Sequence, residues 1–129
     1  MLYRVIIAAE TVGSTGVSTL SIAQILGVSE RNNRRDNITS CMIFHQGFYM
    51  QVIEGARVDI DRLLRRLGED RRLQGLKVLV DKPVAERAFQ EGVTLCGDAR
   101  PMLSAIGQPC LSLLSAYEAE RMLVLRQAA

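Results

Sequence analysis

The run from Arg31 to Gly55, RNNRRDNITSCMIFHQGFYMQVIEG, holds the residues of this chain best suited to bind a flat polar ligand. Two adjacent amides, Asn32 and Asn33, lie at the end of a predicted helix, and a third amide, Gln51, lies on a predicted strand. A side-chain amide offers both a hydrogen-bond donor and an acceptor, as the polar edge of a flat heterocycle requires. The pattern predicts amides at a helix end that face an amide on a strand.

Each of these amides also has a purely structural interpretation. Asn32 and Asn33 can terminate a helix, because asparagine tolerates left-handed backbone near helix ends. Gln51 shares one face of its strand with Tyr49 and Ile53, since side chains alternate along a strand. A glutamine on a covered face needs partners for its amide, either from a ligand or from the core. The residues alone leave both interpretations open.

Length, charge and hydropathy narrow the class of protein. The chain has 129 residues, enough for one domain with one core. Its formal net charge of +2 does not by itself predict an acidic partner. No stretch approaches the ~20 apolar residues of a membrane span. The N-terminal apolar run, Val5 to Ala9, is shorter than the core of a secretory signal, so we expect a cytoplasmic protein.

The sequence offers little for metal binding or catalysis. Its three cysteines, Cys41, Cys96 and Cys110, are widely spaced, so we expect reduced thiols near the core and no disulfide or zinc site. His45 has no second histidine within ligand spacing and is interpreted as a solvated turn residue. No Ser-His-Asp order is present, and Gly13 to Gly16 lacks the lysine of a phosphate-binding loop. We expect a protein that is not an enzyme.

The elements that would position the amides alternate between strands and helices. The predicted strands are 2–9, 38–44, 48–53, 76–80 and 89–95, and the predicted helices are 17–33 and 59–70. The order β-α-β-β-α-β-β resembles the ferredoxin-like plan, an α+β fold with two helices on one face of a sheet. We divide the chain into a domain at 1–96 and a helical extension at 97–129, which packs on the domain or mediates association.

Local signals set the expected boundaries. Ser18 or Thr19 is the expected N-cap of the first helix, after a loop at 10–16. The hairpin loop is expected at His45-Gln46-Gly47, and Asp81-Lys82-Pro83 is expected to end the fourth strand. Apolar residues at helical spacing predict the buried helix faces. They are Leu20, Ala23, Leu26 and Gly27 in the first helix, Ile60, Leu63, Leu64 and Leu67 in the second, and Leu111, Leu114 and Tyr117 in the extension.

Several separated motifs, in order, resemble those of the BLUF family, blue-light sensors that use a flavin. The central motif is RNN-x4-IT-x4-F-x2-G-x-Y-M-QVIEG, within 31–55. The N-terminal LYRVI resembles the family's first strand, and LVDKPVAERAF, at 79–89, resembles its fourth strand and the segment after it. The helix at 59–70, followed by Arg71-Arg72, resembles its second helix. The resemblance spans about residues 1 to 95.

The resemblance implies a cofactor, FAD, that lies between the two helices with its ring near the sheet. Asn33 would hold the polar edge of the ring, with Asn32 beside the ligand, and Gln51 would be the switching glutamine. Arg66 and Asp70 would line the other side of the pocket from the second helix. The resemblance also implies output through a downstream protein partner or through self-association as a homo-oligomer.

Four positions depart from the family pattern. The family's tyrosine and serine on the first strand are replaced by Ile7 and Ala9, and its tryptophan and methionine after the Phe-x-x motif are replaced by Gly92 and Thr94. Isoleucine has no group that donates a hydrogen bond or a proton. The residues implied to couple light to the sheet are therefore absent.

Three hypotheses follow for function. The first is a degenerate BLUF-type regulatory domain that acts through protein–protein interaction without the normal photocycle, with or without bound flavin. The second is an FAD-binding photoreceptor with altered chemistry. The third is a nucleic-acid or phospholigand binder, since more than half of the 16 basic residues lie within 31–72. Acidic residues are interleaved there, and a solvated helix face explains this run with fewer assumptions.

Overall fold

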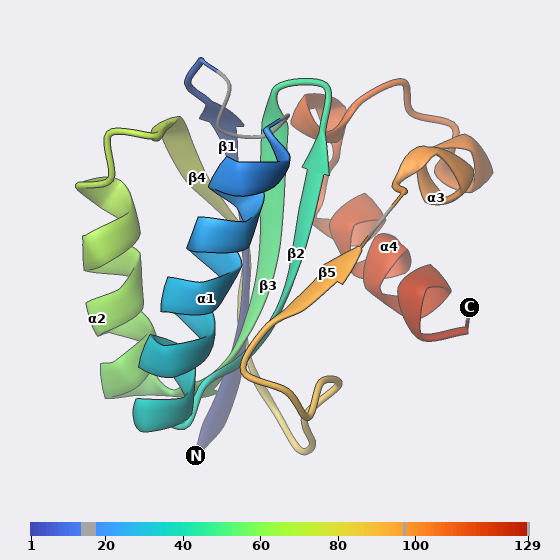
Figure 1. Cartoon of the computed structure of the whole chain (residues 1–129). Helices are drawn as coiled ribbons and strands as arrows, with labels where there is room; N and C mark the ends of the chain where they lie inside the picture. The colour runs from blue at the N-terminus through green and yellow to red at the C-terminus, as the bar shows by residue number, and fades with distance from the viewer. Residues whose placement is uncertain (14–17, 97, 129) are drawn as a thin grey trace.

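A five-stranded sheet lies between two layers of helices (Figure 1). The computed structural model describes residues 1–13, 18–96 and 98–128. The elements are β1 (Leu2–Thr11), α1 (Thr19–Arg35), β2 (Thr39–His45), β3 (Phe48–Ala56), α2 (Arg57–Gly68), β4 (Leu73–Val84), β5 (Thr94–Cys96), α3 (Arg100–Ile106), the 3-10 turn η1 (Leu111–Leu113) and α4 (Ala116–Ala128). This order confirms the predicted α+β, ferredoxin-like plan.

The sheet places β1 and β3 at its centre. Its strand order is β4-β1-β3-β2-β5, in which β5 runs parallel to β2 and the other neighbours are antiparallel. Helices α1 and α2 cover one face, and the segment from α3 to α4 covers the other (Figure 1). Because both faces are covered, β1 has a continuous apolar run in place of a strict alternation.

Two apolar clusters fill the spaces between the layers. Val5 and Ile7 of β1 pack beneath α1 and α2, whereas Ile6 between them packs toward the C-terminal helices. Met50 of β3 and Met122 of α4 belong to the same cluster as Ile6. The C-terminal segment therefore supplies part of the core.

The first helix begins and ends close to the predicted residues but is rotated relative to the predicted face. The Ser18 hydroxyl accepts a hydrogen bond from the Ser21 backbone N–H at 3.3 Å, which confirms one of the two expected N-caps. The expectation that Leu20 is buried is wrong, since this side chain is 69% exposed. Leu26, one of the predicted positions, packs on the sheet together with Ile25, which was not predicted. The predicted start at Val17 and residues 14–16 of the expected loop at 10–16 lie outside the described residues.

The end of α1 lies two residues beyond the prediction. The helix runs to Arg35, so Asn32 and Asn33 do not close it. Asp36 is the C-cap, and Asn37 adopts a left-handed φ of 55°. The carbonyl of Asn33 then accepts from the Ile38 backbone N–H at 2.8 Å, which starts the turn into β2. The simple interpretation of these asparagines as helix terminators is thus wrong.

The fourth strand is longer than predicted because it lies at an edge of the sheet. It extends through Pro83, which pairs with Tyr3 in register. Proline cannot donate to a ladder, but an edge strand needs donors on one side only. The expectation that Asp81-Lys82-Pro83 ends this strand is therefore wrong.

The fifth strand is shorter than predicted, and a buried carboxylate explains why. The strand is Thr94–Cys96, whereas 89–95 was expected. The Glu54 carboxylate accepts from the backbone N–H groups of Ala88, at 2.8 Å, and Phe89, at 3.0 Å. These two N–H groups are thus satisfied by a side chain and not by a neighbouring strand.

Two smaller expectations also change. His45 is the last residue of β2, and the hairpin loop is the pair Gln46-Gly47, with φ of 50° and 79°. Two positive φ values suit a two-residue hairpin turn. Tyr117 does not continue the buried stripe of Leu111, because it is 72% exposed. Cys41 and Cys96 are buried and Cys110 is half-buried.

Candidate functional site

A cavity of about 160 Å³ lies between α1 and α2 above the sheet. Its lining is Val28, Ser29, Asn32, Asn33, Met42, Gln51, Leu63, Arg66, Leu67, Asp70 and Arg72. The structure therefore brings together all five residues predicted to bind a cofactor, from α1, β3, α2 and the turn after α2. A smaller hollow of about 50 Å³ shares part of this lining and adds Tyr49 and Phe44.

Asn33 lies at the cavity wall with its amide donor already engaged. The side chain is 1% exposed, and Nδ2 donates to the Gly92 carbonyl at 2.7 Å and to Ser40 Oγ at 3.2 Å. Ser40 Oγ also donates to the Gly92 carbonyl, at 3.0 Å. The carbonyl oxygen of the Asn33 side chain is the atom left for a ligand. Asn33 thus combines a structural role with access to the cavity.

Gln51 lies on the central strand beneath the cavity. It is 1% exposed and stands directly opposite Ile7 of β1 and Met42 of β2. Its Oε1 accepts a short hydrogen bond from the hydroxyl of Tyr49, two residues earlier on the same strand. The sequence places Tyr49 and Gln51 on one face, but it did not identify this bond. The shared face was the signal available for finding it.

The α2 side of the cavity carries charge. Arg66 Nη2 is buried and has no hydrogen-bond partner in the described part of the chain; Asp36 Oδ2 lies 3.6 Å away. Asp70 accepts from Arg72 through the side chain at 2.8 Å and through the backbone N–H at 2.9 Å. The side-chain hydrogen bond from Arg72 lowers the pKa of Asp70, so this carboxyl is ionised at neutral pH. Arg66 offers an unused donor to a ligand.

Arginines near the cavity are paired with acids. Arg35 donates to Asp36 at 3.0 Å, and Arg62 Nη1 lies 3.6 Å from the same carboxylate. The hydrogen bond from Arg35 lowers the pKa of Asp36, and the charges of Arg62 and Arg66 lower it further. Such pairing is typical of a solvated, salt-linked surface. It gives the nucleic-acid hypothesis no separate support.

Two of the four positions that depart from the family pattern, Ile7 and Ala9, lie on β1, next to β3, the strand that carries Gln51. Ile7 is fully buried and belongs to the cluster under α1 and α2. Ala9 is opposite Tyr49, as Ile7 is opposite Gln51. Since cross-strand partners project to the same face, both replacements lie on the cavity side of the sheet.

The other two altered positions lie near β5. A Cβ at Gly92 would lie 2.8 Å from Glu30 Oε2 and 3.3 Å from the Glu30 carbonyl, so a side chain there displaces α1 contacts. The same Glu30 carboxylate accepts from the Val93 backbone N–H at 3.1 Å. Thr94 begins β5 beside Cys41 of β2. The segment at 90–93 is therefore fastened against the end of α1.

A further buried group holds the segment that leads to Gly92. Glu54 is fully buried and forms an ion pair with Arg4 at 2.8 Å, besides accepting from two backbone N–H groups. Arg87 donates to Thr39 Oγ1 at 2.8 Å and to the Glu54 carbonyl at 3.0 Å. The prediction of site residues missed Glu54. A glutamate inside the apolar motif QVIEG was the available signal.

Comparison with known proteins identifies the family. A family model described as sensors of blue-light using FAD, BLUF, matches residues 2–93. The chain belongs to the BLUF family. This finding confirms the resemblance seen in the sequence motifs, and residues 2–93 of the BLUF domain cover β1 to the end of the segment at 90–93.

Solved structures agree with this assignment. BlsA in its ground state matches with a TM-score of 0.88 at 18% identity, over 100% of this chain and 89% of that one. BlrB, a BLUF protein in its dark state, matches with a TM-score of 0.86 at 22% identity, over 98% and 96%. These two likenesses show the fold. No curated protein matches the chain by sequence.

A third neighbour is larger. A bacterial light-regulated adenylyl cyclase matches with a TM-score of 0.74 at 25% identity, over 83% of this chain. The chain corresponds to 33% of the length of that protein. Within the described residues of this BLUF domain, no helix is long and apolar enough to cross a bilayer.

The residues that line the cavity match the polar edge of a flavin, but the cavity is too small for the whole ring system. Amide oxygens, an amide nitrogen and Arg66 Nη2, which has no hydrogen-bond partner among the described residues, supply acceptors and donors around one space. The volume of about 160 Å³ is below the ~300–1,000 Å³ of pockets for drug-sized ligands. A three-ring heterocycle therefore requires lining side chains such as Met42 or Leu67 to move.

Proposed function

We propose that this BLUF domain is a flavin-binding regulatory module that acts through a protein partner or a second copy of itself, without the family's normal photocycle. The observation that carries the proposal is the gathering of Asn32, Asn33, Gln51, Arg66 and Asp70 around one cavity, with Ile7 opposite Gln51. The proposed setting is the cytoplasm, and the proposed role is not enzymatic.

Asn33 and Arg66 would bind the ligand through different groups. Asn33 presents its side-chain carbonyl oxygen, because its Nδ2 is taken by Gly92 and Ser40. Arg66 presents a buried donor that has no hydrogen-bond partner within the described residues, and a charged donor of this kind strengthens a bond to a carbonyl or a phosphate. A bound flavin would supply absorption of blue light, and these residues would fix its orientation.

Ile7 is the reason for proposing an altered light response. Its side chain lies on the cavity side of β1, opposite Gln51, and carries no hydrogen-bonding group. It can pack against a ring but cannot exchange a proton with Gln51. The position therefore supports ligand packing and removes the family's coupling between ring and glutamine.

The strand that carries Gln51 also supports the proposed output. Met50 and Val52 flank Gln51 and project to the opposite face, into the cluster that holds α3 and α4. A shift of β3 at Gln51 would therefore change the packing of the C-terminal helices. We place the partner-binding surface on those helices, where Leu113 and Tyr117 are exposed.

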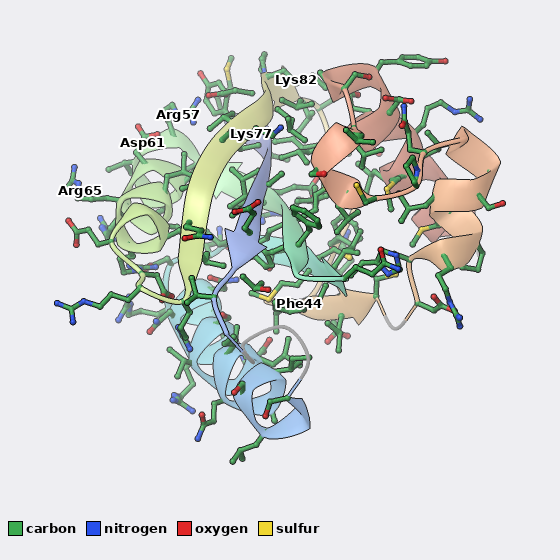
Figure 2. The ribbon with its side chains drawn as sticks, turned by 90° about the horizontal axis from the view of Figure 1, so that it is seen from above. Phe44, Arg57, Asp61, Arg65, Lys77 and Lys82 are labelled. Atoms are coloured by element: carbon green, nitrogen blue, oxygen red, sulfur yellow. The ribbon has the colours of Figure 1, made fainter. Side chains whose placement is uncertain are left out.

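Titration of the purified protein with FAD and FMN tests the proposal. We expect binding, seen as quenched flavin fluorescence, and no lasting red shift of the absorption band under blue light. Arg66→Met should weaken binding about ten- to hundredfold, because it removes a charged donor at the cavity. Arg65→Met is the matched control, since Arg65 of α2 is exposed and projects outward from the molecule (Figure 2). Absence of binding, or equal losses in both variants, would contradict the proposal.

The hydrogen bond between Tyr49 and Gln51 favours a second candidate, a photoreceptor with altered chemistry. It places a phenol on the switching glutamine, although from β3 and not from β1. A reversible red shift under illumination of the flavin-loaded protein would favour this candidate over the first.

A further inference from the structure

We infer that Tyr49 is the positioning residue for Gln51: its hydroxyl holds Gln51 Oε1 and turns the Nε2 group toward the cavity, so that the ligand atom beside Gln51 must be a hydrogen-bond acceptor. The consequence for the ligand rests on the proposed function. The orientation of Gln51 is a property of the free protein.

The geometry of β3 brings the two side chains together. Tyr49 and Gln51 are two residues apart on one strand and project to the same face. They are 2% and 1% exposed, so neither group can satisfy its hydrogen bond with bulk water. An unpaired polar group at such a site costs more than the bond itself contributes. The pairing is therefore maintained whether or not a ligand is bound.

The surroundings of Tyr49 restrict its ring to this position. Phe44 of β2 packs against it, with ring centroids 5.1 Å apart and an interplanar angle of 44°. On the other side, the β1 residue opposite Tyr49 is Ala9, whose small side chain leaves room for the ring. The apolar Ile7 next to it offers no competing group to Gln51. These neighbours place the hydroxyl on Gln51.

The direction of the bond decides what the cavity presents. A carboxamide oxygen only accepts and its nitrogen only donates. Because the phenol donates to Oε1, the Nε2 group of Gln51 is left for the cavity that Gln51 lines. Burial raises the pKa of Tyr49, so the phenol remains a donor throughout the neutral range. The ligand edge beside Gln51 is thus required to be a carbonyl or a bare ring nitrogen.

The Tyr49→Phe variant tests this inference, because it removes the hydroxyl and retains the ring. In the free protein, we expect the side-chain amide resonances of Gln51 to shift or broaden in the nuclear magnetic resonance spectrum. In the flavin-bound protein, we expect FMN affinity to fall about two- to tenfold and the absorption maximum of the bound flavin to move. Tyr3→Phe, which removes the hydroxyl of a β1 tyrosine outside the lining of the cavity, is the matched control and should change neither reading.

Unchanged Gln51 resonances in the Tyr49→Phe protein would overturn the inference. If wild-type protein does not bind flavin, the proposed function fails while the measurement on the free protein still decides the role of Tyr49. If the variant does not fold, the wild type supplies the test. Its Tyr49 hydroxyl proton should exchange slowly and show a nuclear Overhauser contact to Gln51, and rapid exchange without that contact would overturn the inference.

Discussion

At the scale of single residues, three neighbouring side chains define the chemistry beneath the cavity. Ile7 lies opposite Gln51 on β1, and Tyr49 donates to Gln51 from two residues earlier on β3. The phenol partner of the glutamine thus comes from β3 and not from β1. If position 7 corresponds to the family's tyrosine, as we propose, Tyr49 supplies a phenol beside the position that lacks one.

Tyr49 should ionise only as the protein unfolds. Burial raises the pKa of this phenol well above the ~10 of an exposed tyrosine. The pKa of Tyr49 is higher in the folded protein than in the unfolded chain. The contribution of the neutral phenol to folding stability is therefore complete below pH ~10 and is lost as the pH rises beyond it. A phenolate absorbance titration should show Tyr49 ionising together with loss of circular dichroism. Ionisation of Tyr49 while the native circular dichroism is retained would contradict this.

At the scale of elements, the segment between β4 and β5 is held by hydrogen bonds both to the sheet and to α1. Glu54 and Arg87 hold its first half against β2 and β3. Asn33 and Glu30 hold its second half against α1, through Gly92 and Val93. Asn33 belongs to both this attachment and the cavity. A ligand that displaces Asn33 would therefore also displace Gly92 and the start of β5.

A side chain at Gly92 should loosen this attachment. Gly92→Ala would place a Cβ 2.8 Å from Glu30 Oε2 and 3.3 Å from the Glu30 carbonyl, which we expect to cost about 1–3 kcal/mol of unfolding free energy. Gly68→Ala, at the end of α2, is the matched control, because a Cβ there meets nothing within 4 Å. The control should be neutral or stabilising by up to about 1 kcal/mol in urea unfolding. Equal stabilities of the two variants would contradict the close contact at Gly92.

At the scale of the whole molecule, the sheet separates two layers of helices and packs against both. Helices α1 and α2 cover one face of the sheet, and the C-terminal helices cover the other (Figure 1). Tyr49 and Gln51 of β3 project to the first face, and Met50 and Val52 project to the second. A single strand thus contributes to the candidate site and to the packing of the candidate output helices. The C-terminal layer is a structural part of the core and not a detachable tail.

Removing a buried side chain from α4 tests that role. Met122 is fully buried in the cluster with Ile6 and Met50, so Met122→Ala should lower the unfolding free energy by about 2–5 kcal/mol. Arg121→Ala is the matched control one residue earlier, on the exposed side of the helix. Thermal or urea unfolding measures both. If Met122→Ala unfolds at the same midpoint as the control, α4 does not form part of the core in solution.

The sequence by itself determined the order of the elements and some of the polar residues that line the cavity. Alternating and helical spacings are local signals, so they predicted four of the five strands near their observed places and the two helices on one face. The amides Asn32, Asn33 and Gln51 were chosen from their own motif. Arg66 and Asp70 came from the resemblance to the family. All five line the cavity.

Only the tertiary structure decided which groups those residues contact. Asn33 donates to Gly92, which is 59 residues away in the chain, and Glu54 takes the backbone donors of Ala88 and Phe89. Such bonds depend on which segments the fold brings together, and a local pattern holds no information about them. The buried face of α1, the length of β5 and the hydrogen bond from Tyr49 to Gln51 also depend on contacts between distant segments. A buried polar group takes the partner that its neighbours leave within reach.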